Sequence, residues 1–289
     1  MKIKTEIKMK KENILLTLIK EQKLGFISLV TIILIIFIAI FADKVAPYDP
    51  LATDFANSMA KPSLKHLLGT DELSRDILSR IIFATRTSLI MGFGPTTINM
   101  IIGTIVGMLS GLSGKVVDTI IMRIVDILLS FPFTILAMAI VYNLGPSLFN
   151  LFIALVLVGW ADIARVVRAE TIALKENTYI EAAKSMGVSK FTIMYRHILP
   201  NITSTLIVLY TMKVPGAILS EAGLSFLGFG AQPPDTSLGV MVSKGRTYVC
   251  DAPWISIAPG VFILIIAMSF NFLGDSLRDI LDTSTRDDR

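Results

Sequence analysis

The sequence predicts an all-α integral membrane protein with six transmembrane helices. Of its 289 residues, 53% are hydrophobic and only 17% are charged, and the mean hydropathy is +0.68. Average soluble domains carry about 25% charged residues, so this chain is too apolar for that class. We therefore expect a multi-pass protein of the cell membrane.

Each expected span is an apolar run close to the length of about 20 residues that crosses the roughly 30 Å hydrocarbon layer. The first run follows a basic region, as in a cleaved signal peptide. It is long for a signal, however, and no small-residue cleavage pattern closes it before Asp43, so a retained helix is the better interpretation. The expected spans are 24–42, 88–112, 117–144, 149–167, 202–227 and 255–273.

The net charge of +4 comes largely from lysines ahead of the first span. Basic flanks tend to stay in the cytosol, so this charge predicts orientation and not nucleic-acid binding. Six crossings then place both termini in the cytoplasm. The resulting organisation is a basic cytoplasmic tail (1–23), a first transmembrane helix (24–42), an extracytoplasmic segment (43–85), a domain of five helices with a cytoplasmic loop at 168–200 (86–275), and a cytoplasmic C-terminal tail (276–289).

The polar loop between the fourth and fifth spans carries the clearest local signals. Thr178 followed by Glu181 has the spacing of a capping box, and Ser189 can cap a second short helix. Gly187 between them suits a sharp turn, while Pro200 suits the first turn of the next membrane helix. We expect a helix, a turn and a second helix.

The order Glu-Ala-Ala from residue 181, then Gly187 and Leu-Pro from residue 199, resembles the EAA loop of ABC-importer permeases. In that family the loop docks into a groove on a separate ATPase subunit. The resemblance therefore implies a coupling role, although Glu181 can also serve only as a local cap. The implied coupling residues are Glu181, Ala182, Ala183, Met186, Gly187, His197, Leu199 and Pro200.

Further motifs resemble the dipeptide, oligopeptide and nickel branch of these permeases, in the second permease type. They are Leu-Gly-Thr-Asp from residue 68, Glu-Ala-Gly-Leu-Ser-Phe-Leu-Gly from residue 221, and Asn-Phe-Leu-Gly-Asp from residue 271. His197 also matches the peptide branch and not the broad family pattern. Leu238 and Thr283 depart from the branch, where Trp and Pro are common. The resemblance covers roughly residues 40 to 282 and implies the type I ABC importer permease fold, with an ABC transmembrane type-1 domain at 86–275.

No catalytic apparatus is visible in the sequence. The segment from Gly111 to Lys115 lacks the spacing and the hydroxyl of a phosphate-binding loop. His66 and His197 fall on opposite sides of the predicted membrane, and Cys250 is the only cysteine, so we expect no metal site. We expect no cofactor on this chain, and the resemblance implies that partner ATPase subunits use ATP and magnesium.

Two features inside the spans point to packing and to a pathway. Gly103, Gly107 and Gly111 share one helix face, which favours close packing over the alternative of a sliding surface. Lys213 lies near the middle of the fifth span, where an ionisable group normally faces a cavity or a partner. We name Lys213 and Glu221 as pathway candidates. The alternative is a structural ion pair of Lys213, either with Glu221 or with a carboxylate of a partner permease.

The expected function is that of a permease subunit in an ATP-driven ABC importer. The resemblance implies a homologous permease, two ABC ATPase subunits and an extracytoplasmic solute-binding protein as partners, within membrane lipid. Di- or oligopeptides are the expected substrate, and nickel or a metal chelate is the alternative. An ion-gradient-driven transporter would need coupling-ion residues and inverted halves, and neither is visible. A membrane enzyme would need clustered catalytic groups, and a scaffold would lack an ATPase-docking loop.

Overall fold

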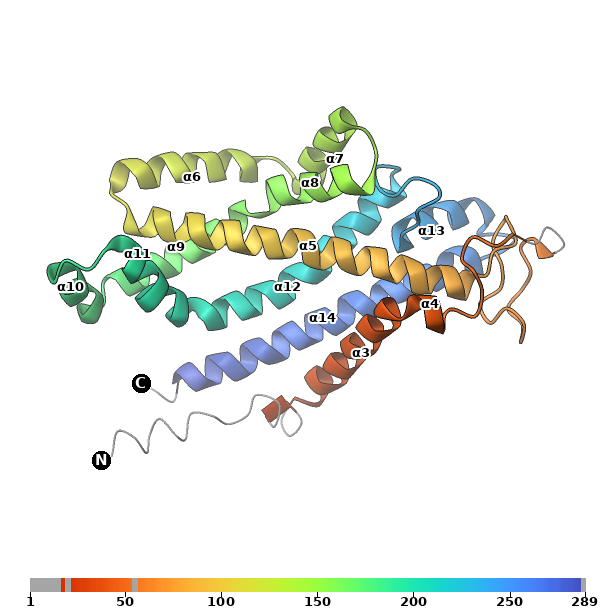
Figure 1. The fold of residues 1–289 in the computed structure, drawn as a ribbon, viewed down its shortest axis with the longest axis horizontal. Helices are drawn as coiled ribbons and strands as arrows, with labels where there is room; N and C mark the ends of the chain where they lie inside the picture. Colours follow the sequence, from red (N-terminus) through yellow and green to blue (C-terminus); the bar gives the residue numbers. More distant parts are fainter. Residues whose placement is uncertain (1–16, 19–21, 54–56, 287–289) are drawn as a thin grey trace.

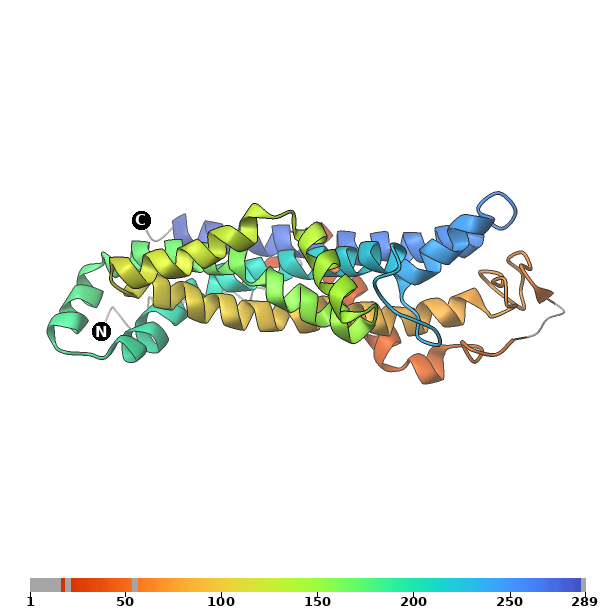
Figure 2. The same cartoon turned by 90° about the horizontal axis from the view of Figure 1, so that it is seen from above.

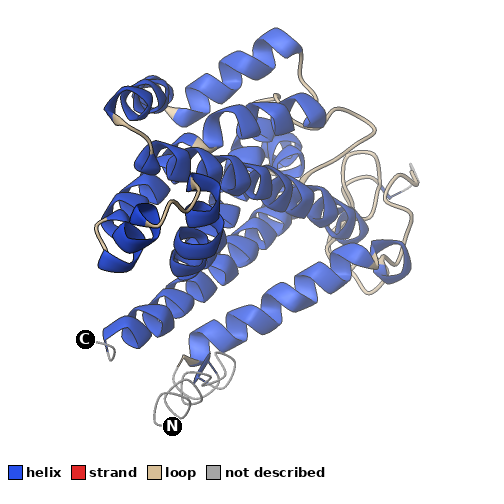
Figure 3. Ribbon diagram, turned by 60° about the vertical axis from the view of Figure 1, so that its left-hand side comes forward, coloured by secondary structure: helices blue, strands red, loops and turns tan. Residues whose placement is uncertain are grey.

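The computed structural model describes residues 17–18, 22–53 and 57–286, and over these ranges the chain is helical with no strand (Figure 3). Within the same ranges, an isolated bridge joins Thr70 to Asp76. The predicted all-α class is therefore confirmed. Most of the predicted basic tail lies outside the described residues.

Long helices run along an elongated bundle (Figure 1). Shorter helices lie in its connections. In chain order the elements are α3 (Lys23–Ile40), α4 (Ala42–Val45), α5 (Ile77–Leu112), α6 (Lys115–Ser130), α7 (Phe133–Leu144), α8 (Leu148–Gly159), α9 (Ala161–Lys175), α10 (Thr178–Ser185), α11 (Lys190–Ile193), the π-helix η2 (Met194–Ile198), α12 (Leu199–Phe226), α13 (Leu238–Gly245), the 3₁₀-helix η3 (Arg246–Tyr248) and α14 (Trp254–Arg286).

Five described helical segments are long and apolar enough to cross a membrane, and they cover five of the six predicted spans. The second of them begins earlier than predicted. Asp76 caps α5, because its Oδ2 accepts a hydrogen bond from the Ser79 amide at 2.8 Å, so the helix starts at Ile77. The 36 residues of α5 measure about 54 Å, which is longer than the hydrocarbon layer. Part of α5 must therefore lie outside it.

The predicted third span, 117–144, is wrong as a continuous helix. The chain breaks between α6 and α7, and the two helices are bent by 88°. Pro132 lacks an amide donor and forces the preceding residue out of helical geometry, so Phe131 is extended, with φ −94° and ψ 141°. Counting this bent pair as one crossing gives six.

The ends of the bundle separate the predicted sides. The end of α14 and the α10–α11 region lie toward one end of the molecule, whereas the 57–76 segment and α13 lie at the other, and α3 begins near the middle and runs toward that second end (Figures 1 and 2). This arrangement agrees with an even number of crossings.

The glycine face of α5 is a packing surface, as predicted. A Cβ at Gly103 would stand 2.7 Å from Ile163, and one at Gly111 would stand 2.7 Å from Thr171. At Gly107 it would stand 2.6 Å from the backbone oxygen of Ala164. These distances are closer than side-chain carbons approach, so bare glycines allow α5 and α9 to lie in contact.

We expect Gly107→Ala to destabilise the protein by about 1–3 kcal/mol, since its Cβ would meet backbone that cannot move aside. Thermal unfolding in detergent measures this. Gly223→Ala is the matched control, because a Cβ there meets nothing within 4 Å. Equal midpoints for the two variants would contradict the packing role.

Candidate functional site

The predicted loop 168–200 begins later than expected, because α9 continues to Lys175, and the remaining loop 178–200 has the predicted helix, turn and helix. Gly187 lies in the left-handed region at φ +78°. The amide of Val188 donates to the carbonyl of Ala183 at 3.1 Å, and that of Gly187 donates to Lys184 at 2.9 Å. This pair of bonds is a Schellman motif, which ends α10 and reverses the chain.

The two predicted caps have different outcomes. Ser189 caps α11 as expected, its Oγ accepting from the Thr192 amide at 3.2 Å. The capping box predicted at Thr178 and Glu181 is wrong. Asn177 is the N-cap of α10, and no side-chain hydrogen bond caps that end. The Asn177 amide donates to the carbonyl of Leu174 at the end of α9, at 3.1 Å, and α10 follows directly, from Thr178. A capping box would need Thr178 to precede the helix, so α10 begins one residue too early for it.

The inner face of the loop is anchored in the bundle. Ile180 and Ala183 lie on one face of α10 and are buried, so Ala183 is not part of an exposed docking face as predicted, whereas Ala182 and Met186 are exposed. A hydrophobic cluster joins the loop to α5, α9 and α12, with Leu199 packed at its edge. Its buried members are Met100, Met108, Leu112, Ile163, Val167, Ile180, Ile193, Met194, Ile198 and Ile202.

The outer face of the loop carries large exposed side chains. Met186 and Phe191 are each 76% exposed, and Tyr195 is 77% exposed. Sequence reasoning missed the two aromatics. Their spacing of four residues, opposite the apolar Ile193, was the available signal.

Polar groups surround this apolar face. Partial desolvation by its neighbours and, to a smaller extent, the positive charge of Lys175 lower the pKa of Lys184, which is itself exposed. The His197 ring lies beside that of Tyr179, 6.3 Å between centroids, so His197 links η2 to α10. Pro200 is exposed in the first turn of α12, as predicted.

A second candidate site is a hollow of about 380 Å³ lined by residues of α5 to α9 and of α12. Two of its helices contain a proline, Pro95 in α5 and Pro215 in α12, and Pro132 separates α6 from α7. Broken helices such as the α6–α7 pair are typical of binding sites inside membrane transporters. The lining residues are Pro95, Thr96, Asn99, Leu129, Phe133, Leu155, Val158, Gly159, Asp162, Ile163, Met212, Lys213, Gly216, Ala217 and Ser220.

Lys213 lines the hollow in an ion pair with Asp162 of α9. The alternative of a pair with Glu221 is therefore wrong. Glu221 is fully buried, and it accepts hydrogen bonds from Ser225 at 2.6 Å and from Ser88 at 3.3 Å. These serines satisfy its carboxyl group, and the bond from Ser88 joins α12 to α5. Glu221 is not among the described residues that line the hollow.

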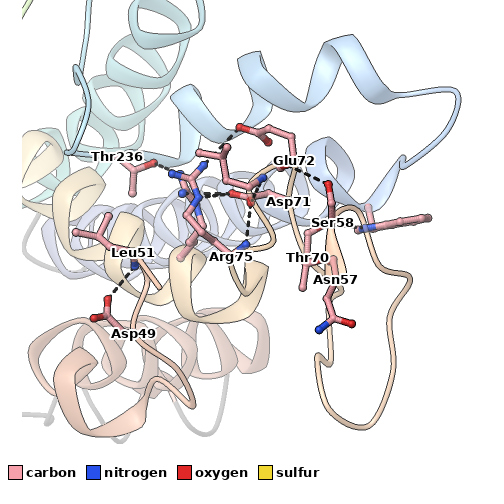
Figure 4. Close-up of polar contacts among 12 residues, drawn as sticks. Asp49, Leu51, Asn57, Ser58, Thr70, Asp71, Glu72, Arg75 and Thr236 are labelled. Carbon is pink, nitrogen blue, oxygen red and sulfur yellow. Dashed lines mark hydrogen bonds and ion pairs between the residues drawn. The ribbon is translucent and has the colours of Figure 1, made fainter. Parts of the chain in front are cut away.

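A network of charged side chains stands at the opposite end from the loop. Arg75 Nε donates to Asp71 Oδ2 at 2.7 Å (Figure 4), and Arg80 Nη1 lies 3.3 Å from the same oxygen. Arg80 also donates to Thr236 Oγ1 at 3.3 Å. Burial and the nearby Arg80 lower the pKa of Lys244. The network ties the 57–76 segment to the chain before α13.

Comparison with known proteins gives the class of the chain. Residues 103–287 match the family described as binding-protein-dependent transport system inner membrane component. Residues 18–62 match the N-terminal TM domain of oligopeptide transport permease C. The chain therefore belongs to this family and is a transport permease subunit of the inner membrane, as the loop and outer motifs predicted.

Individual relatives are similar over most of their length. The dipeptide transport system permease protein DppC of Alkalihalophilus pseudofirmus is 42% identical, with 91% of this chain and 87% of that protein covered. The probable D,D-dipeptide transport system permease protein DdpC of Escherichia coli is 40% identical, with 93% of this chain and 90% of that protein covered. The glutathione transport system permease protein GsiD of Pectobacterium atrosepticum is 42% identical, with 87% of this chain and 84% of that protein covered.

Among solved structures, the chain is similar to the MetNI methionine ABC transporter in inward-facing conformations. The TM-score is 0.56 at 22% identity, with 71% of this chain and 96% of that chain covered. This likeness concerns the fold, and it confirms the predicted type I importer architecture.

The cap geometry makes a local prediction. Ser189→Ala should destabilise α11 by about 1 kcal/mol, because the Thr192 amide loses its acceptor. Thr178→Ala should have a smaller effect, since Thr178 caps nothing. Amide hydrogen exchange over residues 178–198 compares the two variants, and faster exchange in Thr178→Ala than in Ser189→Ala would contradict the assignment.

Proposed function

We propose that this permease subunit imports di- or oligopeptides in an ATP-driven complex. The complex would contain a homologous permease, two ABC ATPase subunits and an extracytoplasmic solute-binding protein. The observation that carries the substrate class is that similar relatives are named for dipeptide, D,D-dipeptide and glutathione transport. All three substrates are short peptides or peptide derivatives. This chain would bind no cofactor, and ATP and magnesium would be used by the ATPase subunits.

Loop 178–200 is proposed as the coupling element, with its exposed face docked on an ATPase subunit. Met186, Phe191 and Tyr195 supply apolar area for insertion into a groove. The buried face supports transmission, because Ile180 and Ile193 belong to the same cluster as residues of α5, α9 and α12. A close-packed contact moves as a unit. Displacement of the loop would therefore displace these helices together.

Movement of α9 and α12 would change the hollow, since each contributes residues to its wall. ATP binding would favour the state open to the binding protein, and hydrolysis would return the inward-open state. Such alternation between two global states requires differential binding to each. In this orientation loop 178–200 and both termini are cytoplasmic, and the predicted segment 43–85 is extracytoplasmic up to the start of α5 at Ile77. Of the two pathway candidates we retain Lys213, because it lines the hollow.

Gly187→Asp should abolish coupling while the membrane helices stay folded. The left-handed backbone at φ +78° disfavours a side chain, so the turn between α10 and α11 would change. The measurement is peptide-stimulated ATPase activity and peptide uptake in proteoliposomes that contain the whole complex and the binding protein.

Gly228→Asp is the matched control. Gly228 also has a positive φ, of +89°, in a Schellman motif, and a Cβ there also meets nothing within 4 Å, but it lies between α12 and α13. We expect its coupling to resemble wild type. Equal uptake by both variants would overturn the coupling role, and stimulation by nickel alone would overturn the peptide assignment.

Tyr195→Ala should weaken assembly with the ATPase subunits, because an exposed aromatic that fills a groove accounts for much of the binding free energy. A loss of about tenfold in affinity is expected, which corresponds to about 1.4 kcal/mol. Tyr142→Ala removes an equally exposed tyrosine, 78% exposed, from α7. Co-purification at graded salt and detergent compares the two, and equal retention of the ATPase would contradict the proposed contact.

A further inference from the structure

We infer that the Asp162–Lys213 pair and Asn99 form a binding site for the two charged ends of a short peptide. The free carboxylate would pair with Lys213. The ammonium group would pair with Asp162 and donate a hydrogen bond to Asn99 Oδ1. This inference rests on the proposed function and assigns a substrate-recognition role to three side chains of the hollow.

Asn99 points to a ligand that carries a donor. Its side chain lines the hollow and is 7% exposed. Nδ2 donates to the Leu155 carbonyl at 3.1 Å, whereas Oδ1 is buried and has no hydrogen-bond partner among the described residues. Buried polar atoms are rarely left unsatisfied, and each exception calls for an explanation. An N–H group entering the hollow would supply the missing partner.

The neighbouring ion pair is accessible from the hollow. The side chains of Lys213 and Asp162 are 40% and 39% exposed. Asp162 is held in place at its other oxygen, because Oδ1 accepts from the Ile163 amide at 2.8 Å. Arg165, one turn further along α9, is paired with Asp126 at 2.6 Å and so does not compete for Asp162. The two charges can therefore exchange partners without rearrangement of the helices.

Charge balance selects the class of ligand. A zwitterion that separates Lys213 from Asp162 offers each of them an opposite charge, so no charge inside the membrane is left unpaired. A bare divalent cation would satisfy Asp162 alone and would leave Lys213 beside a like charge. The pair thus favours a peptide with free ends over a metal ion.

The rest of the hollow suits ligands with varied side chains. Its volume of about 380 Å³ is within the usual range for small-molecule sites. Apart from Asn99, Asp162, Lys213 and the hydroxyls of Thr96 and Ser220, the wall is largely apolar. Recognition of the two ends, with nonspecific apolar contact between them, would accept many sequences.

The test uses the complete complex in proteoliposomes with saturating binding protein, and compares uptake of dialanine, dialaninamide and N-acetyl-dialanine. Lys213→Met should slow the two peptides with a free carboxylate about tenfold and leave dialaninamide near its wild-type rate. Asp162→Asn should slow the two peptides with a free ammonium group and leave N-acetyl-dialanine near its wild-type rate. The preference of the binding protein cancels, because each peptide is compared with its own wild-type rate.

Asp126→Asn breaks a neighbouring ion pair outside the hollow and is the matched control, expected to affect all three peptides equally. Equal losses for all three peptides in Lys213→Met and Asp162→Asn would make the pair structural and overturn the inference. If these variants fail to assemble, the test uses Asn99→Leu, which keeps the ion pair. The uptake rate of each peptide is again divided by its own wild-type rate. A selective loss for peptides with a free ammonium group supports the site, and equal ratios for all three peptides overturn it. Wild-type complex that transports nickel but none of the peptides would overturn the proposed function itself.

Discussion

The close contact between α5 and α9 is the constraint on which the rest of the structure depends. Three glycines remove the side chains that would keep the helices apart, so Ile163, Ala164 and Thr171 pack directly against α5. α9 begins at the hollow and ends just before loop 178–200. Its contact with α5 therefore fixes the positions of both candidate sites relative to α5. A side chain at any of these glycines would move the hollow and the loop together.

Ion pairs between helices also hold α9 in place, by joining it to α6 and to α12. Arg168 forms a bidentate pair with Asp118 of α6, including a contact of 2.6 Å, and thus joins α9 to the helix that the proline break would otherwise leave loosely attached. The Lys213–Asp162 pair joins α9 to α12 in the same way but lies in the wall of the hollow. A charge left without its partner at membrane depth would be costly, so each pair holds two helices together. An accessible pair can also exchange partners with a ligand.

The sequence predicted the fold well where a local physical rule decided the outcome. Apolar length located five of the spans, and Gly187, Ser189 and Pro200 had the predicted places in the loop. Apolar length alone failed at residues 117–144. The run is apolar on both sides of Pro132, but this proline lacks an amide donor and breaks the helix there. The capping rule also failed at Thr178, because the end of the preceding helix decided where α10 begins.

By itself, the sequence determined the all-α membrane class, the order of the spans and the family, since these depend on composition and on motifs contiguous in the chain. Only the tertiary structure decided which side chains meet. Asp162 and Lys213 are distant in sequence and on different helices, and Glu221, on the same helix as Lys213, instead contacts serines. Helix periodicity assigns a residue to a face, but the rotation and packing of whole helices decide what that face contacts.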